Sequence, residues 1–316
     1  MEVENILAKN ISAAGDKSAY DAACKRLLAN KIILAWIMKS CLEEYRDFSV
    51  DEIAEKYIEG NPQIARTALH PDEGEDVSGE QIKEAKTEDS TIKEGRVTYD
   101  IRFYAVAPLS GEMVSLIINV EAQSNFYPGY PIIKRGIYYC SRMISSQYGV
   151  EFTDSHYERI KKVCSIWICS SPPEYRENTI NRYVVREENM IGDIAEKKGN
   201  YDLLTVVIIC LGHSGDDKYT GILKLLNVLL SSEKDPEEKK KILQDDFDIK
   251  MTKELESEVS EMCNLSQGIE EKGIEIGTLR AIENLMDTLK LTAEQAMAAL
   301  KIPETERLKY AARLNR

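Results

Sequence analysis

The stretch Arg96-Val-Thr-Tyr-Asp-Ile-Arg-Phe-Tyr-Ala-Val-Ala107 alternates apolar and polar side chains and is rich in β-branched and aromatic residues, which is typical of a β-strand. The turn residues Pro108-Leu-Ser-Gly-Glu112 follow it. After them, Met113-Val-Ser-Leu-Ile-Ile-Asn-Val-Glu-Ala-Gln123 has the composition of a second strand. The three segments together predict a β-hairpin, and this hairpin is the most informative segment of the chain.

The position of the turn predicts the pairing of the hairpin, in which the numbers of opposed residues add up to about 220 to 222. Asp100 then lies opposite a residue between Val120 and Ala122, and directly opposed Cβ atoms are about 4.5–5.5 Å apart. Side chains alternate between the faces of a strand, so Glu121 and Gln123 share one face. We therefore expect the carboxylates of Asp100 and Glu121 to converge on one cation.

A divalent cation would relieve the repulsion between these two carboxylates. Mg²⁺ prefers oxygen ligands and typically keeps waters plus one or two carboxylates, and Mn²⁺ is an alternative. The backbone carbonyl of Ala122 is a candidate third ligand. Such an ion lowers the pKa of a bound water and polarises a phosphoryl oxygen, as phosphodiester hydrolysis requires. The alternative explanation of the same pattern is a pair of acidic strand residues that face water.

The segment Tyr130-Pro-Ile-Ile-Lys-Arg-Gly-Ile-Tyr-Tyr-Cys-Ser-Arg142 predicts a helix directly after the acidic strand. Arg135, Tyr139 and Arg142 fall on one stripe of it, at steps of four and three residues. The planar guanidinium of Arg suits phosphate groups, and Tyr can donate a hydrogen bond or stack. This stripe, with Lys134 beside it, is a candidate DNA contact; an ordinary amphipathic helix with surface arginines is the alternative.

Outside the hairpin, helical patterns cover Lys17–Glu59 and the chain from Lys218 onward, and buried-strand patterns cover Lys161–Cys169 and Thr205–Gly212. Within the first helical region, Ser49-Val-Asp-Glu52 has the spacing of a capping box. The last piece, Ala293–Ala312, contains two short helical patterns. They form either a small helix-turn-helix for DNA or, since the charges are mixed, a helical hairpin that caps a domain.

Residues 61–95 hold nine acids against four bases and the chain breakers Pro62, Pro71, Gly74, Gly79 and Gly95. This composition predicts a long acidic surface excursion with little regular structure. It is either an inhibitory or partner-binding flap or simply a solvated loop.

The composition of the 316 residues excludes wholesale disorder, because 43% are hydrophobic and 30% are charged. No apolar run reaches the length of a membrane span, and the acidic start predicts no export signal. The seven cysteines form no C-x-x-C pair, which argues against zinc and favours a cytoplasmic location. The net charge of −13 argues against nucleic acid as a partner, but residues 96–170 alone carry eight bases and six acids.

Taken as a set, several segments resemble the PD-(D/E)XK nuclease superfamily, and more narrowly its transposase family, also described as recombination-promoting nucleases. They are Thr98-Tyr-Asp-Ile-Arg-Phe-Tyr104, Leu116-Ile-Ile-Asn-Val-Glu-Ala-Gln123, Phe126-Tyr-Pro-Gly-Tyr130, Arg135-Gly-Ile-Tyr-Tyr139, Lys162-Val-Cys-Ser-Ile-Trp-Ile168 and Glu261-Met-Cys-Asn-Leu-Ser266. The resemblance covers most of residues 20–280. It implies an α/β fold with a restriction-endonuclease-like αβββαβ core, in which helices flank a mixed central sheet, and a helical C-terminal extension.

The resemblance also implies roles for individual residues. Asp100 and Glu121 would be the metal-binding acids, and Gln123 would occupy the position that is Lys in the family name and place the attacking water. Glu44 is the candidate for the upstream helical acid of the superfamily, with Glu43 as the alternative. Gln can hydrogen-bond a water but cannot carry charge, and the proline of the family name is replaced by Tyr99.

The sequence thus predicts a Mg²⁺-dependent DNA endonuclease of the transposition or recombination type. The expected organisation is N-terminal helices over residues 1–60, the excursion 61–95, a nuclease core over 96–215 and charged helices over 216–316, through which copies could associate. The alternative is a catalytically weak nucleic-acid-binding or assembly protein that retains the nuclease scaffold.

Overall fold

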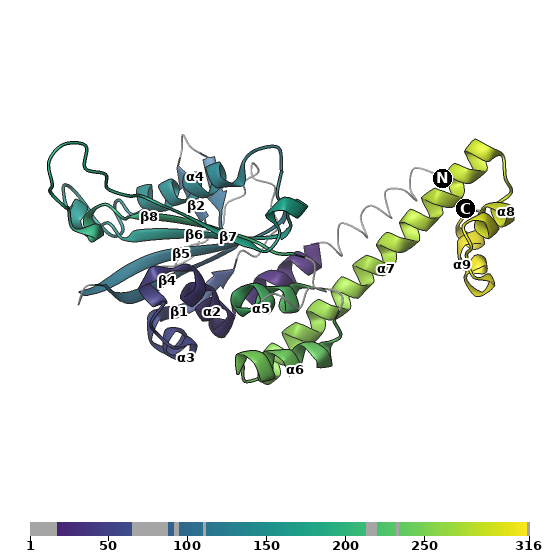
Figure 1. The fold of residues 1–316 in the computed structure, drawn as a ribbon, viewed down its shortest axis with the longest axis horizontal. Coiled ribbons are helices and arrows are strands. Elements are labelled where there is room, and N and C mark those ends of the chain that lie inside the picture. Colours follow the sequence, from purple (N-terminus) through teal and green to yellow (C-terminus); the bar gives the residue numbers. More distant parts are fainter. Residues whose placement is uncertain are drawn as a thin grey trace. The chain divides into compact units, whose positions relative to one another are not determined.

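The computed structural model describes residues 18–64, 88–91, 95–109, 112–212, 220–231 and 234–314. The chain forms two compact units, one over residues 18–263 and a second that contains residues 264–314. The first unit is α/β, with a mixed six-stranded sheet flanked by helices (Figure 1). The predicted acidic excursion falls mostly on residues 65–87 and 92–94, which lie outside the described residues.

The sheet contains, in spatial order, β1 (Ile58–Ile64), β4 (Ile101–Leu109), β5 (Glu112–Asn125), β6 (Lys162–Ser171), β8 (Leu204–Cys210) and β7 (Thr179–Val184). β5, β6 and β8 run parallel to one another, and the remaining neighbours pair antiparallel. A separate two-stranded sheet is made by β2 (Glu88–Thr91) and β3 (Gly95–Thr98).

The predicted hairpin is confirmed as β4 and β5. Ile101 lies opposite Val120, and the numbers of paired residues add up to 221 along the whole ladder. The turn is shorter than predicted, because Pro108 lies within β4 and pairs with β5. The predicted first strand is divided, since the chain bends at Asp100 between β3 and β4.

Helices cover both faces of the sheet. A helix over residues 18–28, α2 (Lys31–Cys41), α3 (Val50–Glu52) and α5 (Gly221–Leu230) lie on one face, and α4 (Ile132–Ser145) lies on the other (Figure 1). The short helical turns are η1 (Glu43–Tyr45), η2 (Ile53–Tyr57), η3 (Tyr157–Arg159), η4 (Glu174–Arg176) and η5 (Lys198–Asn200). The Ser49 half of the predicted capping box is confirmed, because the side chain of Ser49 accepts a hydrogen bond from the backbone N–H of Glu52 at 3.1 Å. The side chain of Glu52 accepts a hydrogen bond from Lys56.

The core between α4 and the sheet is aromatic. The ring of Tyr139 packs at 5.3 Å from both Tyr99 and Trp167, and all three side chains are buried. Trp167 donates its indole N–H to Ser165 Oγ at 2.8 Å, so its polar atom is satisfied. Gly136 lets the helix approach this core, since a Cβ atom there would lie 2.7 Å from Val206 Cγ1.

The two edge strands, β1 and β7, are not predicted from the sequence. β7 exposes most of its side chains and pairs on one side only, so its residues show no apolar alternation. β1 contains Gly60 and Pro62, which suggest a loop, and its pairing with β4 is irregular between Glu59 and Gln63. Proline is tolerated at a sheet edge because it removes no ladder hydrogen bond on the solvent side.

From residue 220 the chain is helical, as predicted. α6 (Pro236–Phe247) and the first part of α7 (Lys253–Leu289) belong to the first unit. In the second unit, α8 (Ala293–Ala299) and α9 (Glu304–Leu314) are the two short helices predicted near the C-terminus. Thr292 forms a capping box with Gln295 at the start of α8. Ile282, Met297 and Tyr310 are buried together in the small core of this unit.

Two further findings concern membrane-spanning helices and the cysteines. None of the helices in the described ranges is both long enough and apolar enough to cross a membrane. The seven cysteines are all buried and carry free thiols, as their apolar surroundings in the sequence indicated.

We expect Gly136→Ala to destabilise the first unit by about 1–3 kcal/mol, because the new methyl group must displace Val206 or Trp167. Gly277→Ala in α7 is the matched control. That helical glycine has nothing within 4 Å of an added Cβ, so the substitution should stabilise its helix by up to about 1 kcal/mol. Thermal unfolding followed by circular dichroism measures both; equal effects of the two substitutions would contradict the close approach at Gly136.

Candidate functional site

The hairpin register brings Asp100 and Glu121 together, as predicted. The backbone N–H of Asp100 donates to Glu121 Oε1 at 3.1 Å, and the backbone N–H of Ala122 donates to Asp100 Oδ2 at 3.1 Å. Each acid is thus held by the backbone of the other strand. Glu121 is 3% exposed, so this pair lies at the edge of the core and not on a water-facing strand surface.

Lys25 and Asp21, on the helix over residues 18–28, complete the cluster. The ammonium group of Lys25 lies 2.7 Å from Asp100 Oδ1 and 2.8 Å from Asp21 Oδ2. Lys25 is buried, whereas the side chain of Asp21 is 35% exposed. Neither residue is predicted from the sequence. Their signal is a charged pair four residues apart in a helix, on the same face as the apolar Leu28.

Burial and charge act against each other in this cluster. Burial raises the pKa of Asp100, and the charge of Lys25 and the hydrogen bond from Ala122 oppose that shift. Burial by itself would lower the pKa of Lys25, but the charge of Asp100 and hydrogen bonds to both carboxylates raise it above its ordinary value. Lys25 therefore stays protonated and keeps a positive charge beside Asp100 and Asp21.

Two residues of the predicted basic stripe on α4 reach this cluster. Arg135 donates to the Tyr139 hydroxyl at 2.6 and 3.1 Å and to the Tyr130 hydroxyl at 2.9 Å. Its guanidinium carbon lies 5.2 Å from the ring centre of Trp167. Burial raises the pKa of Tyr139, and the nearby charge of Glu121 raises it further. Arg135 and Tyr139 thus lie within electrostatic reach of the acids.

The other predicted contacts of this stripe are placed differently. Arg142 is 4% exposed and donates to the Tyr138 hydroxyl at 3.3 Å, so it presents no guanidinium at the surface. Lys134 is exposed and has no ion-pair partner among the described residues. Gln123 lies in β5 opposite Cys169 of β6, but its side chain is outside the described part.

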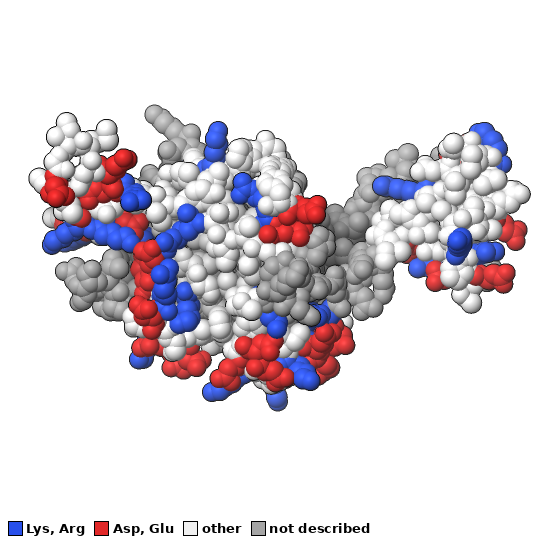
Figure 2. All heavy atoms as spheres, in the orientation of Figure 1, with Lys and Arg blue, Asp and Glu red and all other residues white. Residues whose placement is uncertain are grey.

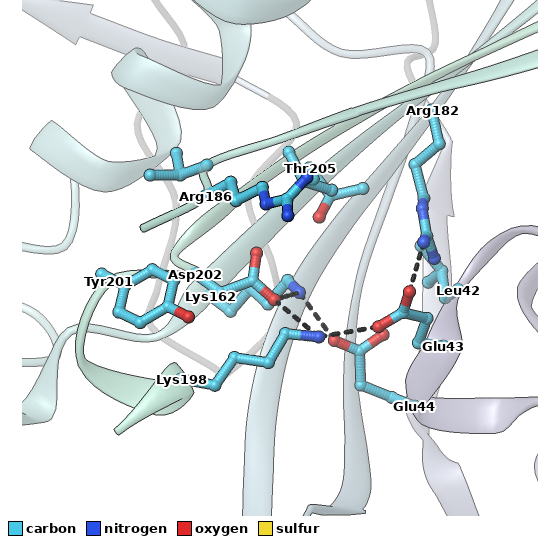
Figure 3. A pocket seen from close by; sticks show the side chains of 12 residues that line it. Leu42, Glu43, Glu44, Lys162, Arg182, Arg186, Lys198, Tyr201, Asp202 and Thr205 are labelled. Carbon is cyan, nitrogen blue, oxygen red and sulfur yellow. Dashed lines mark hydrogen bonds and ion pairs between the residues drawn. The ribbon is translucent and has the colours of Figure 1, made fainter. Parts of the chain in front are cut away.

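Glu44, predicted as the upstream acid, lies elsewhere. Its carboxylate and that of Asp202 both pair with Lys162 at 2.7 Å (Figure 3). Lys162 opens β6 opposite Leu116, five residues before Glu121 on β5, which corresponds to about 16 Å along the strand. The structure therefore does not bring Glu44 to the strand acids.

The alternative residue, Glu43, also lies away from the strand acids. It pairs with Arg182 and, at 2.7 Å, with Lys198 (Figure 3). These ion pairs hold the pKa of Glu43 at about 2, chiefly through the hydrogen bonds from Lys198 and Arg182. Both glutamates line a cavity of about 170 Å³ that also includes Tyr201 and Thr205.

The donor set around Asp100 fits a hard divalent ion. No group of three or more His, Cys, Asp or Glu residues is placed to hold a metal within the described ranges. Mg²⁺, however, often uses only one or two carboxylates together with waters and substrate oxygens. The carboxylates of Asp100 and Glu121 and the Ala122 carbonyl are all oxygen donors, and the carboxylate of Asp100 already binds the positive charge of Lys25.

Comparison with known proteins gives no relative of this chain: no family model, no curated protein and no solved structure matches it. The distribution of charged side chains does not indicate a binding partner either. On the face of the first unit drawn in Figure 2, Lys and Arg side chains alternate with Asp and Glu and form no broad basic surface.

We expect Glu44→Gln to lower the free energy of unfolding by about 3 kcal/mol, because it removes one of the two carboxylates on a buried ammonium group. Glu43→Gln is the matched control. Its side chain is 40% exposed, so the expected loss is below about 1 kcal/mol. Urea denaturation measures both; a Glu44 variant as stable as the wild type would show that the pairing with Lys162 contributes no net stability.

Proposed function

We propose that this protein is a metal-dependent DNA endonuclease. The observation that carries the proposal is the adjacent pair of Asp100 and Glu121, in which backbone N–H groups bind both carboxylates and the buried Lys25 pairs with Asp100. The order of elements supports it as well. A helix, three antiparallel strands (β1, β4 and β5), the helix α4 and the parallel strand β6 occur in this order along the chain, with the small sheet of β2 and β3 between β1 and β4. Without that small sheet, this is the αβββαβ order of the restriction-endonuclease-like fold.

In this proposal, Asp100, Glu121 and the carbonyl of Ala122 hold Mg²⁺ or Mn²⁺. Asp21 takes the part of the upstream helical acid in place of Glu44, because it already shares Lys25 with Asp100. The ion would lower the pKa of a bound water and polarise the scissile phosphate. The protein's own residues bind and orient the DNA backbone around these acids.

Lys25 supplies the positive charge that Gln123 cannot. The amide of a glutamine at position 123 can orient a water molecule by hydrogen bonding, but it is uncharged at neutral pH. The ammonium group of Lys25, 2.7 Å from Asp100, offsets the negative charge of the acids and faces the same cluster. Arg135, with its planar fork near Glu121, is the group placed to hold a phosphate, with Lys134 on the exposed side of α4.

A second candidate function has one observation in its favour. Lys25 occupies Asp100 Oδ1 and the Ala122 amide occupies Oδ2, so a metal ion must compete with two existing partners. A protein that retains the nuclease scaffold but binds or assembles on nucleic acid without cutting it would show this same arrangement.

Asp100→Asn and Glu121→Gln should each lower Mg²⁺-dependent cleavage of DNA by about 100-fold or more, since each removes a charged ligand. Cleavage of supercoiled, linear and single-stranded DNA measures the effect, with Glu55→Gln, an exposed acid of the same unit, as control. Calorimetric titration decides between the two functions. Loss of Mg²⁺ and Mn²⁺ binding in both variants supports the nuclease, and no binding by the wild type supports the scaffold protein.

Lys25→Gln should lower cleavage by roughly 10- to 100-fold without weakening metal binding, because it removes a charge that offsets the acids and not a ligand. Lys25→Arg, which keeps the charge, should restore part of the activity. Circular dichroism shows whether each variant is folded, and calorimetry measures its affinity for Mg²⁺. If the Lys25→Gln variant cleaves DNA at the wild-type rate, Lys25 contributes to the structure and not to catalysis.

A further inference from the structure

The acidity of the chain limits how it can bind DNA. Most non-specific affinity for DNA comes from lysines and arginines on phosphates, and the net charge here is −13. Basic and acidic side chains are interleaved on the face in Figure 2. If a DNA strand is to reach Asp100 and Glu121, part of its binding affinity must therefore come from a surface that does not depend on positive charge.

Two exposed tyrosines follow the ends of β5, which carries Glu121, and of its neighbour β6. Tyr127 follows β5 and Tyr175 follows β6, and the last register pair of these parallel strands is Asn125 with Ser171. Tyr127 is 57% exposed and Tyr175 is 71% exposed, yet their hydroxyl groups are hydrogen-bonded to each other. The bond links the two segments through the tips of the two side chains.

The packing beneath these rings holds them in place. Tyr127 packs edge-on against the buried ring of Phe126, with centroids 4.9 Å apart. The guanidinium of Arg176 lies 5.2 Å from the ring centre of Phe126 and 5.8 Å from that of Tyr175. Because the rings are oriented before anything binds, a ligand that stacks on them loses little side-chain entropy.

A third exposed tyrosine connects these rings to the acids. Tyr130 is 41% exposed, and its hydroxyl accepts a hydrogen bond from Arg135, which also holds Tyr139 beside Glu121. Glu121 lies four residues before the end of β5, about 13 Å along the strand, which corresponds to about four stacked nucleotides. The tyrosines are thus within a few nucleotides of the candidate site.

We propose that Tyr127, Tyr130 and Tyr175 form a stacking surface for the unpaired bases of single-stranded DNA, which leads the strand to the acids. Base faces are available for stacking only in an unpaired strand, since in a duplex they stack on one another. Tyr175 lies between Glu174 and Arg176, and Glu177 follows, so this segment carries no net positive charge. The affinity therefore comes mainly from stacking and depends little on salt. That the bound strand is then cleaved rests on the proposed function. The binding of the strand to the tyrosines needs no metal ion.

Fluorescence anisotropy with labelled oligonucleotides in EDTA tests binding apart from cleavage. We expect the single strand to bind at least roughly tenfold more tightly than a duplex of the same length, and an abasic strand with the same number of phosphates to lose this affinity. Equal binding of the abasic strand or of the duplex would overturn the proposal. Tight binding of the single strand by a protein that cleaves nothing would support it while contradicting the nuclease.

Substitutions locate the surface. Tyr127→Ala and Tyr175→Ala should each weaken binding roughly tenfold, and Tyr127→Phe and Tyr175→Phe, which keep the ring, should not. Tyr157→Ala is the matched control: Tyr157 is 65% exposed but lies before β6, at the opposite end of that strand. An effect of Tyr157→Ala as large as those at 127 and 175, or no effect at either of those two positions, would place the DNA elsewhere.

Discussion

The register of the β4–β5 hairpin is the constraint on which the site depends. Successive side chains of a strand face opposite ways, so a slip of one residue would exchange the two faces of β5. Glu121 would then leave Asp100, and an apolar residue would take its place. The backbone N–H groups of Asp100 and Ala122 donate hydrogen bonds to the carboxylates of Glu121 and Asp100, respectively. These hydrogen bonds form only in the observed register. α4 follows β5 directly, so Arg135 and Tyr139 are positioned by the same pairing.

The hairpin and its consequences could be predicted because their signals are local. Alternation, turn residues and helical spacing act within a few residues of one another. They predicted that Asp100 lies opposite Glu121 and that Arg135 and Tyr139 share one helix face. The upstream acid could not be predicted in this way. Glu44 and Asp21 both lie on N-terminal helices, and they differ in the long-range contacts of their lysine partners. Glu44 pairs with the distant Lys162, whereas Asp21 pairs with its helix neighbour Lys25, which reaches Asp100. Contacts across 118 residues leave no periodic signal in the sequence.

The edge strands escaped prediction for a related reason. A strand that pairs on one side and exposes most of its residues has no need of an apolar face, so β7 has the composition of a loop. The same is true of β1, whose glycine and proline indicate a turn. The interior strands β6 and β8, by contrast, are buried almost throughout, and their apolar runs are visible in the sequence.

Two buried lysines have the same arrangement at different points of the sheet. Lys25 is shared by Asp21 and Asp100, and Lys162 is shared by Glu44 and Asp202. In each case one carboxylate comes from an N-terminal helical segment and the other from the sheet or a loop beside it. A buried charge with one partner removed is costly, so each cluster disfavours any packing of the helices that separates them from the sheet.

The buried cysteine thiols can report which elements of the protein open to water. Burial raises the pKa of Cys24, Cys41 and Cys164 to about 12, so almost none of these groups is a thiolate at neutral pH in the closed state. An alkylating reagent can modify such a thiol only when the segment around it opens to water. Since these cysteines lie in two helices and a central strand, the order in which they are labelled reports which element separates first.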